Sequence, residues 1–204
     1  MLTPLVETRQ RSIFHVRAQG AAVFYLADAE AGGVLINSPA FDPHLLRALT
    51  DVAPLRYVFY PSFLGARDVD LWRAAGAQTL ASREESVAMP GMVDIALERE
   101  HRFTRTISFF PMSGRTRGSC ALFCRNKPGV LFLGPVLSLG ARGWPTLLPH
   151  TDDYSWENRL LGALGLRDVR FDYAFTDDFE LGASKIGPGA DKEIQWELQN
   201  ILGF

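Results

Sequence analysis

Two short stretches bring together residue types that can carry chemistry. Residues 60–68 read YPSFLGARD and follow the apolar run LRYVF. Many α/β enzymes hold reactive groups where a strand ends in a short loop that opens a helix, so Ser62 is a candidate nucleophile, although no partner base can be named for it. Residues 150–153, His-Thr-Asp-Asp, combine an imidazole with two carboxylates, which are metal-ligand types. Thr151 and Asp152 also suit the N-cap of a helix over SWENRLL, and we favour that interpretation.

Other residues of potentially reactive types have no suitable partner in the neighbouring sequence. The Ser119-Cys120 pair has neither a G-x-S-x-G turn nor an adjacent base. Cys120 and Cys124 would share one face of a strand about 13 Å apart, at ~3.3 Å per residue, which is too far for a disulfide. We therefore expect two buried thiols in a reducing compartment. The remaining histidines are each alone in their segments, which favours structural or surface roles: His15, His44 and His101.

The amino-acid composition narrows the kinds of protein that this chain can be. The 204 residues are 47% hydrophobic and 22% charged, as expected for one soluble globular domain over residues 1–204. A net charge of −2 and a pI near 6.1 argue against binding to nucleic acid or to an anionic membrane. No basic-then-apolar signal opens the chain, and no window approaches the roughly 18 apolar residues of a membrane span, so we expect a cytoplasmic protein.

The first half of the chain reads as strands followed by alternating helices and strands. Residues 12–18 and 21–27 are expected strands separated by the turn signal Gln19-Gly20, and a further strand over VLINSP completes an antiparallel meander. In FDPHLLRALTDVA, Asp42 is placed as an N-cap and Pro43 as the first helical residue. A strand over LRYVFYP, a helix over ARDVDLWRAAG and a strand over AQTLAS follow.

The second half repeats the order of strands first and helices later. Residues 103–110 alternate as a strand, CALFCRN and GVLFLGP form a hairpin, and RFDYAFTD is a last strand. Helical periods cover SWENRLLGALGL and the closing amphipathic segment ADKEIQWELQNIL. Trp72 and Trp196 have helical core spacing, whereas Trp144, in the loop LGARGWPTLLP, is a candidate for the mouth of a binding site. Two strand groups, each followed by helices, indicate two sheets with helices on the outside.

The order of these pieces resembles the metallo-β-lactamase-fold superfamily over about residues 12–182. AAVFYLADAEAGGVLINSP is similar to the family's opening hairpin and its strand ending in Asp, and LRYVFYPSFLGARDVDLW to its strand, metal loop and helix. FFPMSGRTRGSCALFCRNKPGVLFLGPVL is similar to the strand, Gly-His-Thr loop and Gly-Asp hairpin, and RFDYAFTDDFELG to the final strand and turn. The resemblance implies an α/β fold, a four-layer αββα sandwich of two mixed sheets flanked by helices.

The resemblance also implies metal-ligand positions, which this sequence fills with other residue types. The family usually binds one or two metal ions through His-x-His-x-Asp-His on the first loop, the His of Gly-His-Thr, the Asp of Gly-Asp and a late His. The matching residues here are Ser62, Leu64, Ala66 and Arg67 on the first loop, then Arg115, Pro135 and Asp178, with Asn37 at the usual strand-ending Asp. Zinc or iron needs several imidazole or carboxylate ligands, and arginine stays protonated, so we expect neither a metal nor another cofactor.

Two interpretations of the vacated site stay open. If the fold holds, Arg67, Arg115 and Asp178 converge. An Arg–Asp ion pair would then replace the metal, or the two guanidinium groups beside Ser113-Gly114-Arg115-Thr116 would hold a carboxylate or phosphate. The candidate ligand-binding residues are therefore Ser62, Arg67, Arg115, Asp178, Asn37 and Trp144.

Three functions fit these residues. The first is a metal-free, non-catalytic protein that binds a small anionic molecule or a protein. The second is a hydrolase with an atypical metal site or metal-free chemistry through Ser62, Arg115 and Asp178. The third is a structural subunit that forms homo-oligomers through its C-terminal amphipathic helix. The missing ligands favour the first and third functions over the second.

Overall fold

The computed structural model describes residues 1–98 and 103–203, so His101 lies outside the described residues. The chain separates into two compact units, Met1–Leu97 and Glu98–Phe204, and each is described by itself. The expectation of one domain over residues 1–204 stays a prediction.

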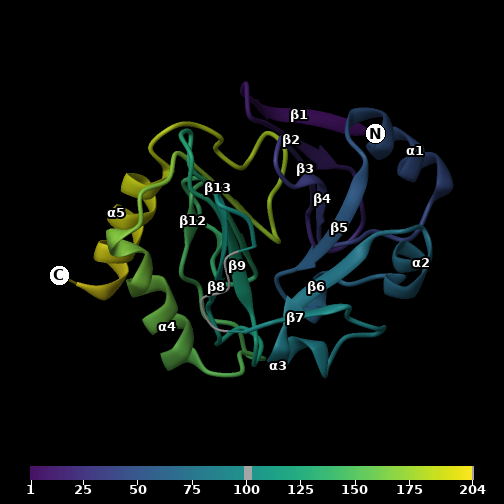
Figure 1. Cartoon of the computed structure of the whole chain (residues 1–204). Coiled ribbons are helices and arrows are strands. Elements are labelled where there is room, and N and C mark those ends of the chain that lie inside the picture. The colour runs from purple at the N-terminus through teal and green to yellow at the C-terminus, as the bar shows by residue number, and fades with distance from the viewer. Residues whose placement is uncertain (99–102, 204) are drawn as a thin grey trace. The chain divides into compact units, whose positions relative to one another are not determined.

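Over the described residues of the first unit, a seven-stranded mixed sheet runs in chain order from β1 to β7 (Figure 1). Strands β1 to β4 pair antiparallel and β4 to β7 pair parallel, as the predicted meander and the later helices require. The strands are β1 (Leu2–Glu7), β2 (Arg11–Val16), β3 (Val23–Asp28), β4 (Gly32–Ile36), β5 (Leu55–Tyr60), β6 (Gln78–Ser82) and β7 (Ile95–Leu97).

Helices α1 and α3 of this unit begin at residues whose side chains cap them. Helix α1 (Pro43–Val52) starts at Pro43, and the Asp42 carboxylate accepts a hydrogen bond from the His44 N–H, as predicted. Helices α2 (Val69–Ala74) and α3 (Arg83–Ser86) and the 3₁₀ turn η1 (Phe63–Gly65) follow. Trp72 is fully buried among Tyr25, Leu35, Leu49 and their neighbours, and its Nε1–H donates to the Pro39 carbonyl at 2.9 Å. The core role predicted for Trp72 is confirmed.

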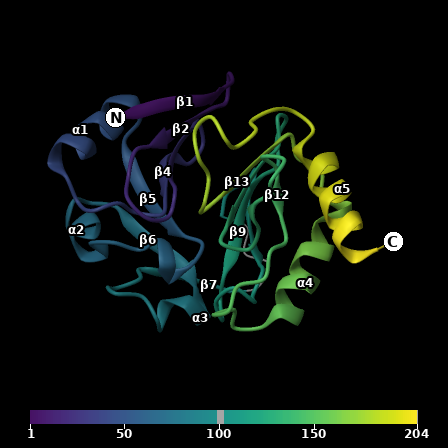
Figure 2. The same cartoon turned by 180° about the vertical axis from the view of Figure 1, so that it is seen from behind.

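The second unit contains a smaller mixed sheet (Figure 2). Over residues 103–203 the order is β13-β10-β9-β8, in which β13 is parallel to β10 and the other pairs are antiparallel. Helices α4 and α5 cover one face of this sheet, as both views show. The elements are β8 (Ile107–Pro111), β9 (Cys120–Cys124), β10 (Val130–Gly134), β11 (Ser138–Leu139), β12 (Pro145–Thr146), α4 (Trp156–Leu164), η2 (Gly165–Asp168), β13 (Tyr173–Thr176) and α5 (Ala190–Leu202).

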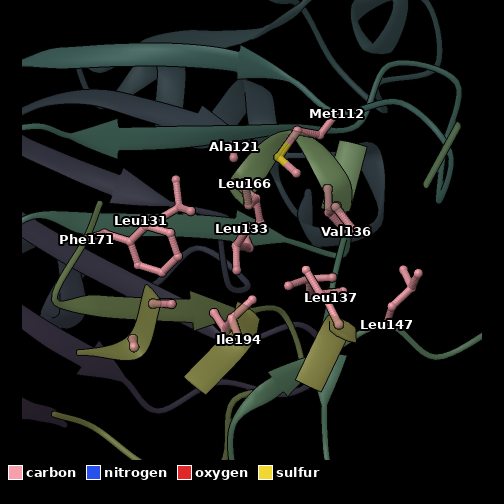
Figure 3. Packing of buried hydrophobic residues seen from close by; sticks show 14 of the residues in the cluster. Met112, Ala121, Leu131, Leu133, Val136, Leu137, Leu147, Leu166, Phe171 and Ile194 are labelled. Carbon is pink, nitrogen blue, oxygen red and sulfur yellow. The ribbon is translucent and has the colours of Figure 1, made fainter. Parts of the chain in front are cut away.

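A hydrophobic cluster between this sheet and its helices holds the second unit together (Figure 3). Leu131 and Leu133 of β10 pack against Ile194 of α5 and Phe171. Cys120 and Cys124 are fully buried thiols on β9, as predicted. None of the helices over the described residues has the length and apolarity that crossing a bilayer requires.

Several sequence expectations need correction. The strand expected from residue 103 begins only at Ile107, because the Thr104 hydroxyl accepts hydrogen bonds from the N–H groups of Thr106 and Ile107 and closes a turn. Trp196 is 48% exposed, so its expected core role is wrong: the buried stripe of α5 runs through Ile194 and Leu198, and Trp196 lies between them on another face. The Arg142 guanidinium lies 4.0 Å above its ring instead.

Candidate functional site

The first loop is built on a capping hydroxyl. Ser62, two residues after β5, is fully buried, and its Oγ accepts a hydrogen bond from the Leu64 N–H at 3.3 Å, which caps η1. Glu85 is also buried, and its carboxylate accepts from the Phe63 N–H at 2.7 Å. A buried hydroxyl used as a cap is a structural group, so the structure gives no support to Ser62 as a nucleophile.

A second hydroxyl, that of Ser38, fixes the end of the same loop. It donates to the Arg67 carbonyl at 2.6 Å and accepts from the Arg67 N–H at 2.9 Å. It also accepts from the Tyr60 hydroxyl at 3.1 Å, and the Ser38 N–H donates to the Gly65 carbonyl at 2.9 Å. One donor and two acceptors are the full capacity of a serine hydroxyl, so Ser38 is committed to holding this loop.

Asn37 lies next to Ser38 and fills the space behind the loop. Its backbone has a φ of 62°, a conformation that asparagine tolerates better than most residues. Its amide donates to the Ala22 carbonyl at 2.8 Å, a bond that an ionised Asp could not make. A Cβ on Gly65 would lie only 2.0 Å from Asn37 Oδ1, so the two residues are packed without spare room. Asn37 therefore fills buried space at the position where the resemblance implies an Asp.

Arg67 carries a positive charge on the first loop that no described residue neutralises. Its residue is exposed, and its guanidinium lies against Gly20. Among residues 1–98 and 103–203, its side chain has no hydrogen-bond or ion-pair partner. The adjoining surface hollow also contains Asp68 and Asp70, whose carboxylates accept from the N–H groups of Phe41 and Met92.

Arg115 of the second unit is neutralised by acids near it in the same unit. Its Nη2 lies 2.9 Å from Asp152 Oδ2, its Nη1 donates to the Asp152 carbonyl at 3.2 Å, and the nearest Asp153 oxygen is 3.9 Å away. Hydrogen bonding from Arg115 holds the pKa of Asp152 below its usual range. Asp178 instead accepts from the Thr176 hydroxyl at 2.6 Å and from the Leu139 N–H at 2.7 Å. The ion pair of the second unit thus joins Arg115 to Asp152 and not to Asp178.

The glycine of the Ser113–Thr116 turn is explained by helix packing. Gly114 has a φ of +138°, and a Cβ there would lie 2.3 Å from the backbone nitrogen of Arg159 in α4. The Gly114 carbonyl accepts from the Ser155 N–H at 3.0 Å. The N-cap of α4 is Ser155, whose hydroxyl accepts from the Asn158 N–H, so the expected caps Thr151 and Asp152 are wrong. Asp152 pairs with Arg115 instead.

Arg159 is a buried arginine with partners in several segments, and the sequence did not lead us to predict this role. Its side chain is 0% exposed, and Nη1 contacts both Asp153 oxygens at 2.9 and 2.8 Å. It also donates to the carbonyls of Val136 and Leu148. The sequence does contain a signal for this role: Arg159 lies four residues before Ala163 on the apolar stripe of the helix, where a buried charge must be paired. Glu85 had a signal too, since Ser82-x-x-Glu85 matches a capping box and the Ser82 hydroxyl accepts from the Glu85 N–H.

Trp144 and His150 have local partners in the second unit. Trp144 is half-buried against the hydrophobic cluster of Figure 3, and the Lys185 ammonium lies 5.9 Å from its ring centre. His150 Nε2 lies 3.0 Å from the Ser138 hydroxyl, and its backbone N–H donates to Asp153. A place for Trp144 at a site mouth stays a prediction.

Comparison with solved structures identifies the fold. The metallo-β-lactamase from Pontibacter korlensis is 16% identical and superposes with a TM-score of 0.71, covering 100% of this chain and 98% of that one. A metallo-β-lactamase of Cronobacter sakazakii is 13% identical with a TM-score of 0.67, covering 94% and 84%. A subclass B3 metallo-β-lactamase of Bradyrhizobium japonicum is 14% identical with a TM-score of 0.61, covering 97% and 93%. The chain has the metallo-β-lactamase fold. No protein-family model matches the sequence, and no curated protein matches it.

The metallo-β-lactamase fold agrees with the predicted α/β architecture. Each unit provides one mixed sheet with helices on one face, which is the sheet-and-helix pair that an αββα sandwich requires. The order of strands and helices expected from the resemblance is therefore confirmed.

The residues that the sequence resemblance assigns to the family's metal-ligand positions do not fit a metal. Leu64, Ala66 and Pro135 carry no ligand atom in their side chains, and Arg67 and Arg115 carry positive charge. The Ser62 hydroxyl caps its own loop, and the Asp178 carboxylate accepts hydrogen bonds from the Thr176 hydroxyl and the Leu139 N–H. Over the described residues, no three His, Cys, Asp or Glu side chains are grouped so that they could hold an ion. The donor chemistry of these positions thus disagrees with that of the family, and we assign no reaction step to a metal.

Proposed function

We propose that this chain is a non-catalytic protein of the metallo-β-lactamase fold that binds a small anionic ligand through Arg67. The observation that carries the proposal is the internal use of the first loop. The Ser62 hydroxyl caps the loop, the Ser38 hydroxyl ties its end, and Asn37 packs against Gly65 where a ligand-bearing loop would need room. Such a loop has neither a nucleophile nor metal ligands to offer a substrate.

The charge of Arg67 supports an anion as the ligand. Its backbone is fixed from both sides by Ser38, while its exposed guanidinium has no partner among the described residues. A guanidinium on an anchored backbone presents a planar fork that matches carboxylate and phosphate oxygens. Arg115 is excluded from this role because Asp152 already neutralises it.

Two measurements test the two parts of this proposal. The first is elemental analysis of protein grown with added zinc and purified without chelator or a metal-binding tag, where we expect far less than one equivalent of zinc, iron or manganese. Bound metal near one equivalent, or hydrolysis of a β-lactam or ester substrate that saturates with concentration, would overturn the non-catalytic part.

The second measurement is calorimetric titration with phosphate and citrate at low ionic strength. We expect binding that Arg67→Gln abolishes and that added salt weakens. Arg47→Gln is the matched control, because Arg47 is an exposed arginine of the same unit on α1. Equal binding by wild type and Arg67→Gln, or no binding at all, would contradict a role for Arg67. The expected cytoplasmic location and homo-oligomer stay predictions.

A further inference from the structure

A cavity of about 920 Å³ lies within the second unit, beside strand β8, helix α4 and turn η2. Strand β8 forms the edge of its sheet over the described residues. The cavity has the size of a small-molecule site. Met112 and Leu166 belong both to its lining and to the hydrophobic cluster of Figure 3, so the cavity borders the core of the unit. None of its lining residues belongs to the first loop or to the other family ligand positions.

Glycines keep the helix side of the cavity open. A Cβ on Gly165 would meet no atom within 4 Å, and one on Gly162 would meet Met112 only at ordinary contact distance, 3.6 Å. A methyl group would therefore fit at both places without a close contact. Leu161, between these glycines and Asn158, also lines the cavity and is 65% exposed. An exposed leucine at the rim of a cavity that mixes polar and apolar side chains leaves apolar surface for a ligand to cover.

A buried hydroxyl without a partner belongs to the same lining. Ser108 is 3% exposed, and its Oγ has no hydrogen-bond partner among the residues that the structure describes. Burying an unpaired hydroxyl is unfavourable, so such a group points to a missing partner. Ser108 lies opposite Phe123 in the β8–β9 ladder and two residues before Phe110, whose ring stacks on Phe123. Its side chain therefore leaves the sheet on the face that α4 covers.

Arg125 supplies the charge of the cavity. Its backbone N–H donates to the Thr106 carbonyl at 2.8 Å, which continues the β8–β9 ladder by one residue. Two residues beyond Phe123, its side chain leaves the sheet on the same face as that of Ser108. Diagonal neighbours in such a ladder are about 7–8 Å apart, within reach of an arginine. The guanidinium has no ion-pair partner in the described part of the chain.

We propose that this cavity binds a small monocarboxylate with an apolar body. The carboxylate accepts hydrogen bonds from the Arg125 guanidinium and the Ser108 hydroxyl, and the apolar body packs on Phe110, Leu161 and Val169. Arg125 is the one charged residue among the described lining residues, and no acid is present there, so the charge of the site selects a single negative charge and disfavours cations. The proposal is independent of the function proposed for Arg67, which lies in the other unit.

Ligand-observed and protein-observed NMR titrations with octanoate and 3-phenylpropanoate test this site. These probes share the carboxylate and distinguish an aliphatic from an aromatic body, and octan-1-ol and octylammonium test whether the charge matters. We expect one or both acids to bind and to shift amide signals of β8, α4 and η2. Octan-1-ol should bind more weakly, and octylammonium should not bind. Saturation by octan-1-ol at the same concentration as octanoate, shifts confined to other elements, or no binding of either acid would overturn the proposal.

Single-residue variants test which side chain binds the carboxylate. Arg125→Gln should weaken acid binding about 10- to 100-fold, because a hydrogen bond to a charged group is lost. Ser108→Ala should weaken binding less, and Gly165→Leu should weaken it by occupying the cavity. Arg117→Gln, at an exposed arginine of the same unit, is the matched control and should bind as wild type. Wild-type affinity in a folded Arg125→Gln variant, with its circular dichroism unchanged, would refute the assignment.

Discussion

Replacing Arg159 with methionine should destabilise the protein strongly. The methionine keeps an apolar stem but removes every hydrogen bond of the guanidinium, including those to both Asp153 oxygens and to the carbonyls of Val136 and Leu148. The Asp153 side chain, 6% exposed, would then be a buried carboxylate without its main cation. Removing one partner of a buried ion pair costs about 3–5 kcal/mol. Arg115 Nη1 stays 3.9 Å from Asp153, so we expect a value near the lower limit, about 3 kcal/mol.

Thermal and urea unfolding followed by far-ultraviolet circular dichroism measure this loss. For a chain of this length, about 3 kcal/mol corresponds to a fall in Tm of roughly 6–12 °C. Arg167→Met is the control, because the Arg167 side chain is 70% exposed, and it should change stability by less than about 0.5 kcal/mol. The double variant Asp153→Leu/Arg159→Met removes both charges, so it should lose less than the sum of the single variants. A Tm for Arg159→Met equal to that of the control would refute the reasoning that this ion pair anchors α4.

Three further perturbations test the two loops. Ser38→Ala removes the partner of the Arg67 backbone and should cost about 1–3 kcal/mol in urea unfolding; a loss within error of zero would contradict the role of this hydroxyl. Gly65→Ala should cost about 1–3 kcal/mol because the new methyl overlaps Asn37, and adding Asn37→Gly should restore part of it; no restoration would mean that the clash lies elsewhere. Arg115→Gln should return the pKa of Asp152 towards its ordinary value of about 3.9, as carbon-detected NMR titration would show. The pKa of Asp152 is lower in the folded protein than in the unfolded chain, so its carboxylate stabilises the fold at pH values above its pKa in the unfolded chain. This stabilisation is lost as the pH falls through its pKa in the folded protein. An unchanged titration midpoint of Asp152 in the variant would refute the pairing.

The elements that were predicted well are those whose signals are local. Helix α1 begins at Pro43 because its own residues cap it, and α5 spans the predicted 190–202 because one apolar stripe defines it. Strands β1 and β7 were not predicted. The first contains Pro4 and has a register shift there, and the second is only three residues long, so both are strands because a neighbouring strand offers hydrogen bonds.

By itself, the sequence determined the types of the side chains that the resemblance assigns to the family's ligand positions. Ligand chemistry is a property of residue type, so the mismatch with zinc or iron was visible without coordinates. Only the tertiary structure decided how each polar group is used: Arg115 pairs with Asp152, Arg159 is buried against Asp153, and Ser38 holds Arg67. Charge partners are chosen by distance and burial between segments far apart in the chain, and one linear pattern fits several pairings. For the same reason the cavity beside Ser108 and Arg125 had no signal in the sequence, because it arises where a sheet edge and a helix meet.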